Sequence, residues 1–190
     1  MNGMTLSAVL LVLLIFSRSA EAESSAGPPL RTVDNVDLHR YTGTWYEIAR
    51  YPNRFQRDCR SDTTAEYTVR TDGKVQVVNS CRQKDGKTKT ARGTAKVVDN
   101  SSNAKLKVTF FWPFYGDYWI IALSPDYRHA IVGEPKRKYL WILSRTPEMD
   151  EGTYKEALEQ IRTAGYDPDK LLKTHHSPRN GQSAANSLPD

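Results

Sequence analysis

The sequence has few of the residues that build covalent scaffolds, metal sites or common catalytic centres. Two cysteines among 190 residues are too few for a small disulfide framework or a four-cysteine zinc site. No Gly-x-Ser-x-Gly sequence occurs, so the common hydrolase nucleophile motif is missing. Of the four histidines, two are the adjacent pair His175 and His176. We therefore expect a non-enzyme, and we assign no catalytic residue, cofactor or metal ligand.

Charge of one sign is not in large excess, because 27 Lys and Arg residues face 22 Asp and Glu residues for a net charge of +5. This mixture does not favour a nucleic-acid partner. The segment from Arg82 to Lys96 carries six basic residues and one acidic residue, and no aromatic side chain is interleaved among them. It predicts either a positive rim that selects anionic head groups or a solvated surface hairpin.

One long apolar run is present, from Leu6 to Phe16. Its length suits the core of a signal peptide and is too short to span a bilayer. Small residues at Ala20 and Ala22 then provide a cleavage site, so we expect a signal peptide over residues 1–22, with an uncleaved anchor as the alternative. No cysteine near that site offers a lipid anchor. We expect an exported protein that is periplasmic and soluble, or secreted.

Export to an oxidising compartment makes Cys59 and Cys81 candidates for one disulfide, and two free buried thiols are the alternative. In a simple hairpin register about Asp72-Gly73, Cys81 faces Thr64 rather than Cys59. A bulge or a curved strand must therefore bring the two sulfur atoms together.

The remaining chain divides into a flexible leader at residues 23–32, one domain at 33–174 and a disordered tail at 175–190. The domain contains eight short apolar or alternating segments, each bounded by turn residues, which predict strands. They are Trp45 to Tyr51, Thr63 to Arg70, Lys74 to Cys81, Thr88 to Val98, Ala104 to Phe111, Tyr118 to Leu123, His129 to Val132 and Tyr139 to Leu143.

One segment has helical spacing, because Asp150 to Ala164 places Tyr154, Ala157, Leu158 and Ile161 on one stripe, and Gly165 follows as a stop. A short edge strand is expected at Leu171 to Lys173. Hairpins in series with no long crossover favour a meander. The predicted fold is all-β: an eight-stranded antiparallel up-and-down β-barrel with one C-terminal α-helix packed outside.

Such a barrel encloses an interior that holds side chains or one small apolar ligand. Strand alternation directs several rings inward, among them Tyr67, Phe110, Tyr139 and Trp141. These rings either fill the core or line a cavity. The segment from Phe111 to Gly116 holds four further aromatic residues, which predict a binding rim, a protein-docking surface or a plug over the barrel end.

Three motifs occur in an order that resembles one known family. Gly43-Thr44-Trp45-Tyr46-Glu47-Ile48-Ala49 resembles the Gly-x-Trp-Tyr opening of the lipocalins, and Asp126-Tyr127-Arg128-His129-Ala130 resembles their second motif. Leu140-Trp141-Ile142-Leu143-Ser144-Arg145-Thr146-Pro147, followed by the helix, resembles the third. Phe111 to Tyr118 is similar to a segment of the bacterial lipocalin, apolipoprotein D and temperature-induced lipocalin branch. The resemblance covers about Val33 to Lys173.

The resemblance implies structural roles for Gly43, Trp45, Asp126, Tyr127 and Arg145, in which Arg145 stacks on Trp45 beside a short N-terminal 3₁₀ turn. It implies that the protein carries or stores a hydrophobic ligand in the barrel, a fatty acid or lysophospholipid, in membrane lipid maintenance. Ligand positions carried over from the family are the pocket aromatics Tyr67, Tyr115 and Trp141; Phe110 and Tyr139 are added by strand alternation alone.

Two other functions stay open at this point. A protein-docking module would use the aromatic rim, and a lipid-acting enzyme could use the same barrel. We expect no nucleic-acid partner and no metal, with peripheral membrane contact and a monomeric or weakly dimeric state.

Overall fold

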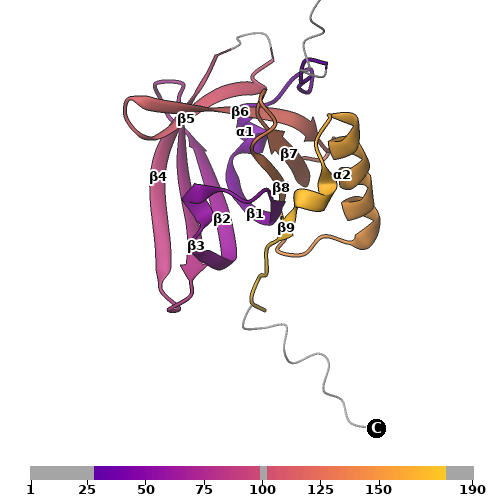
Figure 1. Ribbon diagram of the computed structural model, residues 1–190. Helices are drawn as coiled ribbons and strands as arrows, with labels where there is room; N and C mark the ends of the chain where they lie inside the picture. The colour runs from indigo at the N-terminus through magenta and orange to yellow at the C-terminus, as the bar shows by residue number, and fades with distance from the viewer. Residues whose placement is uncertain (1–27, 99–101, 179–190) are drawn as a thin grey trace, which may run out of the picture.

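The computed structural model describes residues 28–98 and 102–178 (Figure 1). The predicted signal peptide lies outside these residues, as do the chain from 179 to 190 and the first part of the leader. Within the described part, no helix is both long and apolar enough to cross a membrane.

Eight strands form one closed antiparallel sheet, in which neighbours in sequence are neighbours in space and β1 pairs with both β8 and β2. A ninth strand of two residues, β9, pairs with the end of β1. The predicted barrel is confirmed. The strands are β1 (Gly43–Arg50), β2 (Cys59–Val69), β3 (Val75–Gln83), β4 (Thr88–Val97), β5 (Lys105–Phe111), β6 (Phe114–Leu123), β7 (His129–Gly133), β8 (Leu140–Ser144) and β9 (Leu172–Lys173).

Two strands begin four residues earlier than their apolar patterns predict. β2 starts at Cys59 instead of Thr63, and β6 starts at Phe114 instead of Tyr118. The added residues are mostly polar or exposed, and they extend along neighbouring strands beyond the level where the interior is buried. Backbone pairing is set by the partner strand, and so it continues where the hydrophobic pattern has ended.

The predicted helix is present as α2 (Glu151–Thr163) and lies against the outside of the barrel (Figure 1). Asp150 caps it, since its carboxylate accepts a hydrogen bond from Thr153 N at 2.9 Å. Its buried residues Ala157 and Ile161 pack on outward side chains of β7 and β8. Gly165 ends the helix with a φ of 79°.

A short helix, α1 (Leu38–Tyr41), covers one end of the barrel. It is one α-helical turn rather than the predicted 3₁₀ turn, because the Asp37 side chain accepts from both His39 N and Arg40 N and the backbone then closes Tyr41 N to Asp37 O. Beneath it, Trp45 is fully buried. This end of the barrel is therefore closed.

Contacts with the barrel extend beyond the predicted domain boundaries at both ends. Leu30 is buried, and the carbonyl of Pro28 accepts a hydrogen bond from Arg137. After residue 174, His175 O accepts from Asp62 N, and Ser177 N donates to the Asp62 carboxylate at 2.7 Å. The described residues also contain two short 3₁₀ segments. They are η1 (Arg54–Gln56) in the β1–β2 loop and η2 (Pro168–Lys170) after α2.

Candidate functional site

The inward side chains change from buried to exposed along the barrel axis. Near α1, Trp45, Val75 and Leu106 are buried. At the opposite end Phe110 is 42% exposed, and the inward-facing Ala91 is exposed as well. This end carries the β1–β2, β3–β4, β5–β6 and β7–β8 loops. The barrel therefore has a closed end and an open end.

Between the two ends, several inward residues are only partly buried although they pack against the interior cluster. They include Ala65, Val108, Tyr118 and Trp141. Side chains that point into a filled core would be buried completely. Solvent-accessible space therefore reaches past the rim into the barrel, and we call this space the lumen.

Three tyrosine hydroxyl groups meet at the base of the lumen. The Tyr118 hydroxyl lies 2.9 Å from the hydroxyl of Tyr41 and 2.9 Å from that of Tyr67. Burial raises the pKa of Tyr67 to about 12, and it raises the pKa of Tyr41 and Tyr118 as well. All three groups are therefore neutral at physiological pH and retain their protons.

The proton count at this tyrosine cluster leaves one donor over. Three hydroxyl groups carry three protons, and the two hydrogen bonds between them use two. No other described residue accepts from these oxygens. The remaining proton can be donated to an oxygen atom of a ligand or of water in the lumen. Asn79 adds a second polar group on an inward strand position, because its Oδ1 is buried without a partner.

Aromatic side chains from η1, from β8 and from the residue before β8 line one side of the open end. Tyr139 and Trp141 stack with ring centroids 6.0 Å apart, and Phe55 lies 5.6 Å from Tyr139. Trp141 Nε1 donates to Gln56 Oε1 at 3.0 Å. The structure therefore brings the predicted residues Tyr139 and Trp141 together, with η1 next to them.

The other predicted ligand residues lie in different places. Tyr67 is at the base of the lumen, within the tyrosine cluster. Phe110 lies across the open end, with its ring over Gly93. Tyr115 is on the outer face. Lys96 Nζ lies 5.0 Å from the centroid of its ring. The next residue, Gly116, pairs with the inward-facing Val108, so strand alternation directs Tyr115 outward. The bulge between Val108 and Phe111 accompanies this arrangement.

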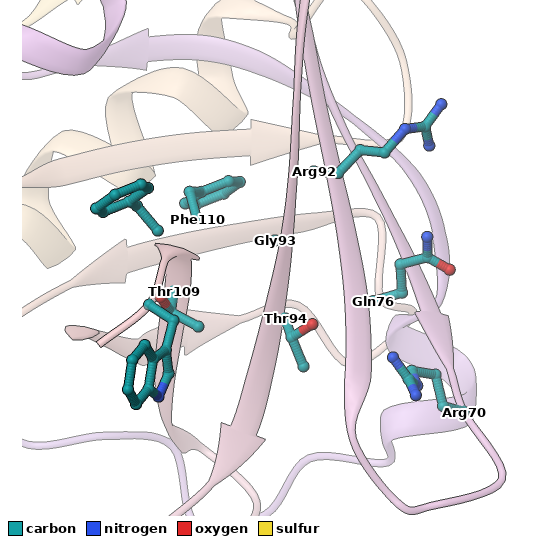
Figure 2. Close-up of a pocket in the computed structure, with 9 residues that line it drawn as sticks. Arg70, Gln76, Arg92, Gly93, Thr94, Thr109 and Phe110 are labelled. Atoms are coloured by element: carbon teal, nitrogen blue, oxygen red, sulfur yellow. The ribbon is translucent and has the colours of Figure 1, made fainter. Parts of the chain in front are cut away.

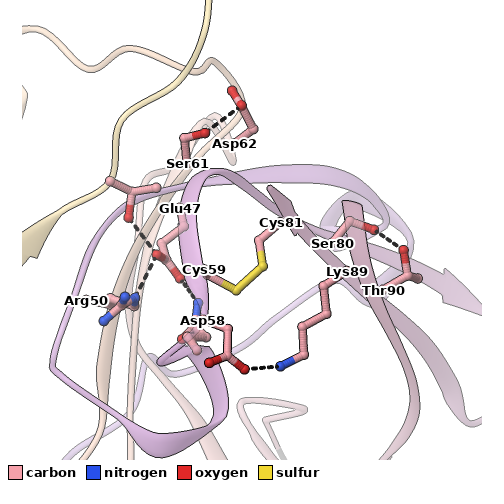
Figure 3. The surroundings of a disulfide bond; sticks show 12 residues. Glu47, Arg50, Asp58, Cys59, Ser61, Asp62, Ser80, Cys81, Lys89 and Thr90 are labelled. Carbon is pink, nitrogen blue, oxygen red and sulfur yellow. Dashed lines mark hydrogen bonds and ion pairs between the residues drawn. A yellow bond between two sulfur atoms is a disulfide. The ribbon is translucent and has the colours of Figure 1, made fainter. Parts of the chain in front are cut away.

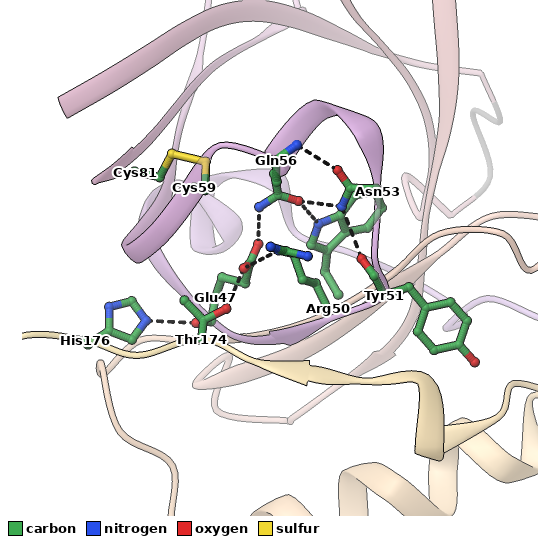
Figure 4. Close-up of polar contacts among 10 residues, drawn as sticks. Glu47, Arg50, Tyr51, Asn53, Gln56, Cys59, Cys81, Thr174 and His176 are labelled. Carbon is green, nitrogen blue, oxygen red and sulfur yellow. Dashed lines mark hydrogen bonds and ion pairs between the residues drawn. A yellow bond between two sulfur atoms is a disulfide. The ribbon is translucent and has the colours of Figure 1, made fainter. Parts of the chain in front are cut away.

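A buried carboxylate links the open end to the C-terminal segment (Figure 4). Glu47 accepts hydrogen bonds from Gln56 and from the Thr174 hydroxyl, and its carboxylate lies 3.2 Å from Arg50 Nε. His176 Nε2 is 2.8 Å from the Glu47 backbone oxygen. Through Gln56 this network also reaches Trp141. β1, η1 and the residues after β9 are thus held together at the rim.

The pKa of Glu47 is raised, because burial of the carboxylate outweighs the hydrogen bonds from Thr174 and Gln56 and the attraction of Arg50. A raised pKa means that the native state binds the proton more tightly than the unfolded chain does. The stability from this group is then complete below the ordinary carboxyl pKa of about 4.3. It is lost as the pH rises through the raised value.

We expect the difference in unfolding free energy between the wild type and Glu47→Gln to shift in favour of the wild type as the pH falls from neutrality. Urea unfolding at a series of pH values measures it. Asp126→Asn is the control of opposite sign, because a hydrogen bond from Ser124 lowers the pKa of Asp126. A Glu47→Gln difference that is independent of pH contradicts the assigned shift.

The two cysteines form the predicted disulfide, Cys59–Cys81, near the open end (Figure 3). The β2–β3 ladder shifts register twice, between Cys59 and Ser61 and again between Ser61 and Thr64. These shifts supply the bulge that the pairing required. The predicted facing of Cys81 and Thr64 is wrong, since Thr64 pairs with Ser80. Lys89 Nζ, opposite Cys81, forms an ion pair with Asp58 Oδ2 at 3.1 Å.

The residues of the family motifs gather at the closed end. Arg145 lies over the Trp45 ring at 3.9 Å, and Gly43 has a φ of 89° beside it. The Tyr127 hydroxyl accepts from Asp37 N, just before α1. Asp126 accepts from Ser124 Oγ at 2.6 Å and so shapes the β6–β7 turn. None of these residues lies at the open end.

Sequence reasoning missed several residues of the site. Tyr41 and Tyr118 are brought to Tyr67 only when the barrel closes, so local alternation gave no signal for the cluster. Glu47 sits inside a recognised motif, and its burial follows from its inward position on β1. Glu134 is a further buried carboxylate, which accepts from Lys136 N at 2.9 Å and from Tyr139 N at 3.3 Å and thereby shapes the loop before Tyr139.

Comparison with known proteins gives a consistent result. Residues 36–176 match a family model described as a lipocalin-like domain. Temperature-induced lipocalin-1 of Arabidopsis thaliana is 43% identical over 169 residues, which cover 85% of this chain and 89% of that protein. Outer membrane lipoprotein Blc of Escherichia coli (strain K12) is 44% identical, covering 78% and 85%. Apolipoprotein D of Mus musculus is 31% identical, covering 77% and 79%.

Solved structures share the fold at lower sequence identity. Insecticyanin from the tobacco hornworm Manduca sexta superposes with a TM-score of 0.66 at 23% identity, covering 79% of this chain and 86% of the other. The cockroach allergen Per a 4 gives a TM-score of 0.62 at 21% identity, covering 77% and 93%. At these identities the likeness concerns the barrel architecture alone.

Proposed function

This chain belongs to the lipocalin family, and we propose that it binds a fatty acid or lysophospholipid in the lumen and carries or stores it in membrane lipid maintenance. The observation that carries the proposal is the graded exposure of inward side chains, from buried Trp45 to Phe110 at 42%. The acyl chain enters at the open end and lies along the barrel axis. Binding, rather than catalysis, is the proposed activity.

The lumen offers both parts of such a ligand a suitable environment. A sixteen-carbon chain gains roughly 12 kcal/mol before ordering losses, at about 0.8 kcal/mol for each buried CH₂ group. The rings of Tyr139, Trp141 and Phe110 provide contact area at the open end. The leftover proton of the tyrosine cluster can be donated to a ligand oxygen, and Asn79 Oδ1 can accept from a ligand hydroxyl group.

We propose that the protein is exported, periplasmic or secreted, and acts as a monomer or weak dimer with peripheral membrane contact. The proposed export, to the periplasm or out of the cell, rests on the apolar run and the cleavage-site pattern in residues 1–22. Of the predicted ligand residues we keep Tyr67, Phe110, Tyr139 and Trp141 in the lumen. Tyr115 is assigned to the outer surface because its ring lies over Lys96.

Trp141→Ala is expected to weaken palmitate binding by about 1–3 kcal/mol, since it removes a ring and its stacking on Tyr139 from the lumen wall. Isothermal titration calorimetry measures the affinity directly. Tyr115→Ala is the matched aromatic control and is expected to leave the affinity unchanged. Equal losses in the two variants, or no loss at Trp141, would remove Trp141 from the site.

Native mass spectrometry of the protein as purified tests the ligand class. A mass increment equal to a fatty acid or lysophospholipid supports the proposal, and a pigment or steroid increment replaces that class with another. Failure of palmitate and lysophosphatidylcholine to bind the wild type, with the barrel folded, overturns it.

A further inference from the structure

A second cavity lies on the outer face of the sheet, where β4 and β5 separate (Figure 2). Its volume is about 360 Å³. Arg70, Gln76, Arg92, Thr94, Thr109 and Trp112 are among the residues that line it. Gln76 and Thr94 face each other on β3 and β4 and alternate with buried inward residues, so their side chains point outward. We call this cavity the outer groove.

The pairing of β4 with β5 ends beside a glycine. The β4–β5 ladder stops at the Thr94–Thr109 pair, although β4 continues back to Thr88. At the next position is Gly93, where a side-chain Cβ would lie 2.7 Å from Thr109 O and 2.8 Å from Phe110 Cδ1. The Phe110 ring occupies this space on the inner side. Residue 93 must therefore be glycine for the Phe110 ring to lie there, at the point where the pairing of β4 with β5 ends.

The charged side chains that line the outer groove are both arginines. Arg92 has no ion pair or hydrogen bond with another described residue, and it is exposed. Arg70 pairs with Asp72 at 3.3 Å and keeps half of its side chain exposed. Thr109 Oγ1 is buried and has no partner. Arg70 and Arg92 thus place two guanidinium groups on the lining of one cavity, and guanidinium groups are suited to phosphate, whose oxygens accept several bonds at once.

An apolar surface adjoins these donors. Phe111 and Trp112, which line the outer groove, are 75% and 77% exposed. Phe114 is 71% exposed and stacks on Phe111 with centroids 6.3 Å apart. We call Phe111, Trp112 and Phe114 the aromatic tip. Aromatic side chains next to cationic groups are suited to the boundary between lipid head groups and acyl chains.

We propose that the outer groove binds the phosphate of a phospholipid head group at a membrane surface while the aromatic tip enters the lipid beneath it. This proposal deepens the peripheral membrane contact proposed above and gives it a site. The groove opens on the outer face of the barrel, and Phe110, at the rim of the lumen, is one of its lining residues. A lipid held there lies next to Phe110 at the rim, where an acyl chain would enter.

Vesicle flotation tests the proposal with full-length protein. The vesicles contain phosphatidylcholine alone or phosphatidylcholine with an equal part of phosphatidylglycerol. Because one basic residue near a membrane surface contributes about 1 kcal/mol, Arg92→Gln is expected to lower partitioning about five-fold. Trp112→Ser is expected to lower it on both kinds of vesicle. Lys155→Gln, the same charge change on exposed α2, is the matched control and is expected to have little effect.

The outcomes distinguish a lipid head group from free phosphate as the ligand, and they distinguish the outer groove from the lumen. If partitioning is unchanged in Arg92→Gln, or equally reduced in Lys155→Gln, the groove is not the head-group site. If inorganic phosphate alone protects Arg92 from a guanidine-modifying reagent and vesicles do not, the site takes free phosphate and the membrane proposal is wrong. Palmitate calorimetry on Arg92→Gln is expected to match the wild type. If the wild type does not bind palmitate, the lumen proposal is overturned, and the proposal for the outer groove is unaffected.

Discussion

Replacing Arg145 with alanine is expected to lower the free energy of unfolding by about 3 kcal/mol. The Arg145 guanidinium donates to three backbone oxygens, those of Arg40 at 2.8 Å, Thr44 at 3.0 Å and Tyr127 at 3.2 Å. It also lies over the Trp45 ring. These contacts join α1, β1 and the β6–β7 turn. Alanine removes all of these contacts, so α1, β1 and the β6–β7 turn are no longer joined through this side chain at the closed end.

The matched variant Arg145→Lys separates charge from geometry. Lysine keeps the positive charge over the Trp45 ring, but its ammonium group does not reproduce the planar arrangement of donors. We expect it to recover less than half of the loss. Arg128→Ala, an exposed arginine at the same end, should stay close to the wild type. Urea unfolding measures all three variants, and wild-type stability in Arg145→Ala would show that these contacts do not stabilise the fold.

Replacing both Cys59 and Cys81 with alanine is also expected to cost about 3 kcal/mol of unfolding free energy. The bond closes a loop with a sequence separation of 22, and in the chain-entropy model opening such a loop frees the unfolded chain by about this amount. The comparison is the oxidised wild type against the double variant in urea. The wild type with reductant should approach the double variant.

The same double variant tests what the disulfide does at the open end. Asp58 and Lys89 keep their ion pair across the gap, so β2 stays near β4, and we expect palmitate affinity to change little once folding is complete. A fall in affinity comparable to that of Trp141→Ala would show that the disulfide also shapes the ligand mouth. No difference in stability between oxidised and reduced wild type would contradict the expected loss.

Local patterns were reliable where neighbouring residues determine the structure. Asp72-Gly73 and Asp85-Gly86 predicted hairpin turns, and both glycines have positive φ, 75° for Gly73 and 80° for Gly86. The stripe on α2 buries Ala157 and Ile161 as its spacing indicated. Alternation assigned Phe110 and Trp141 to inward positions, consistent with the ring of Phe110 over Gly93 and the place of Trp141 beside the interior cluster.

Local patterns failed where a bulge or a distant segment decides. The β5–β6 bulge accompanies Tyr115 on the outer face, while the family position suggested a pocket residue. Two register shifts in β2 are needed before Cys59 can reach Cys81. A one-residue change in register exchanges the two faces of a strand. No count along a single strand reveals where such a change occurs.

The sequence by itself determined the number of strands, the turns between them, the outer helix and the family. Each depends on residues that are close together in the chain, through turn geometry and the spacing of apolar side chains. Only the tertiary structure brought Tyr41, Tyr67 and Tyr118 to one point, buried Glu47 beneath Thr174, and opened the groove beside Gly93. These features depend on closure of the sheet, because closure sets which strands face each other across the barrel and where their pairing ends.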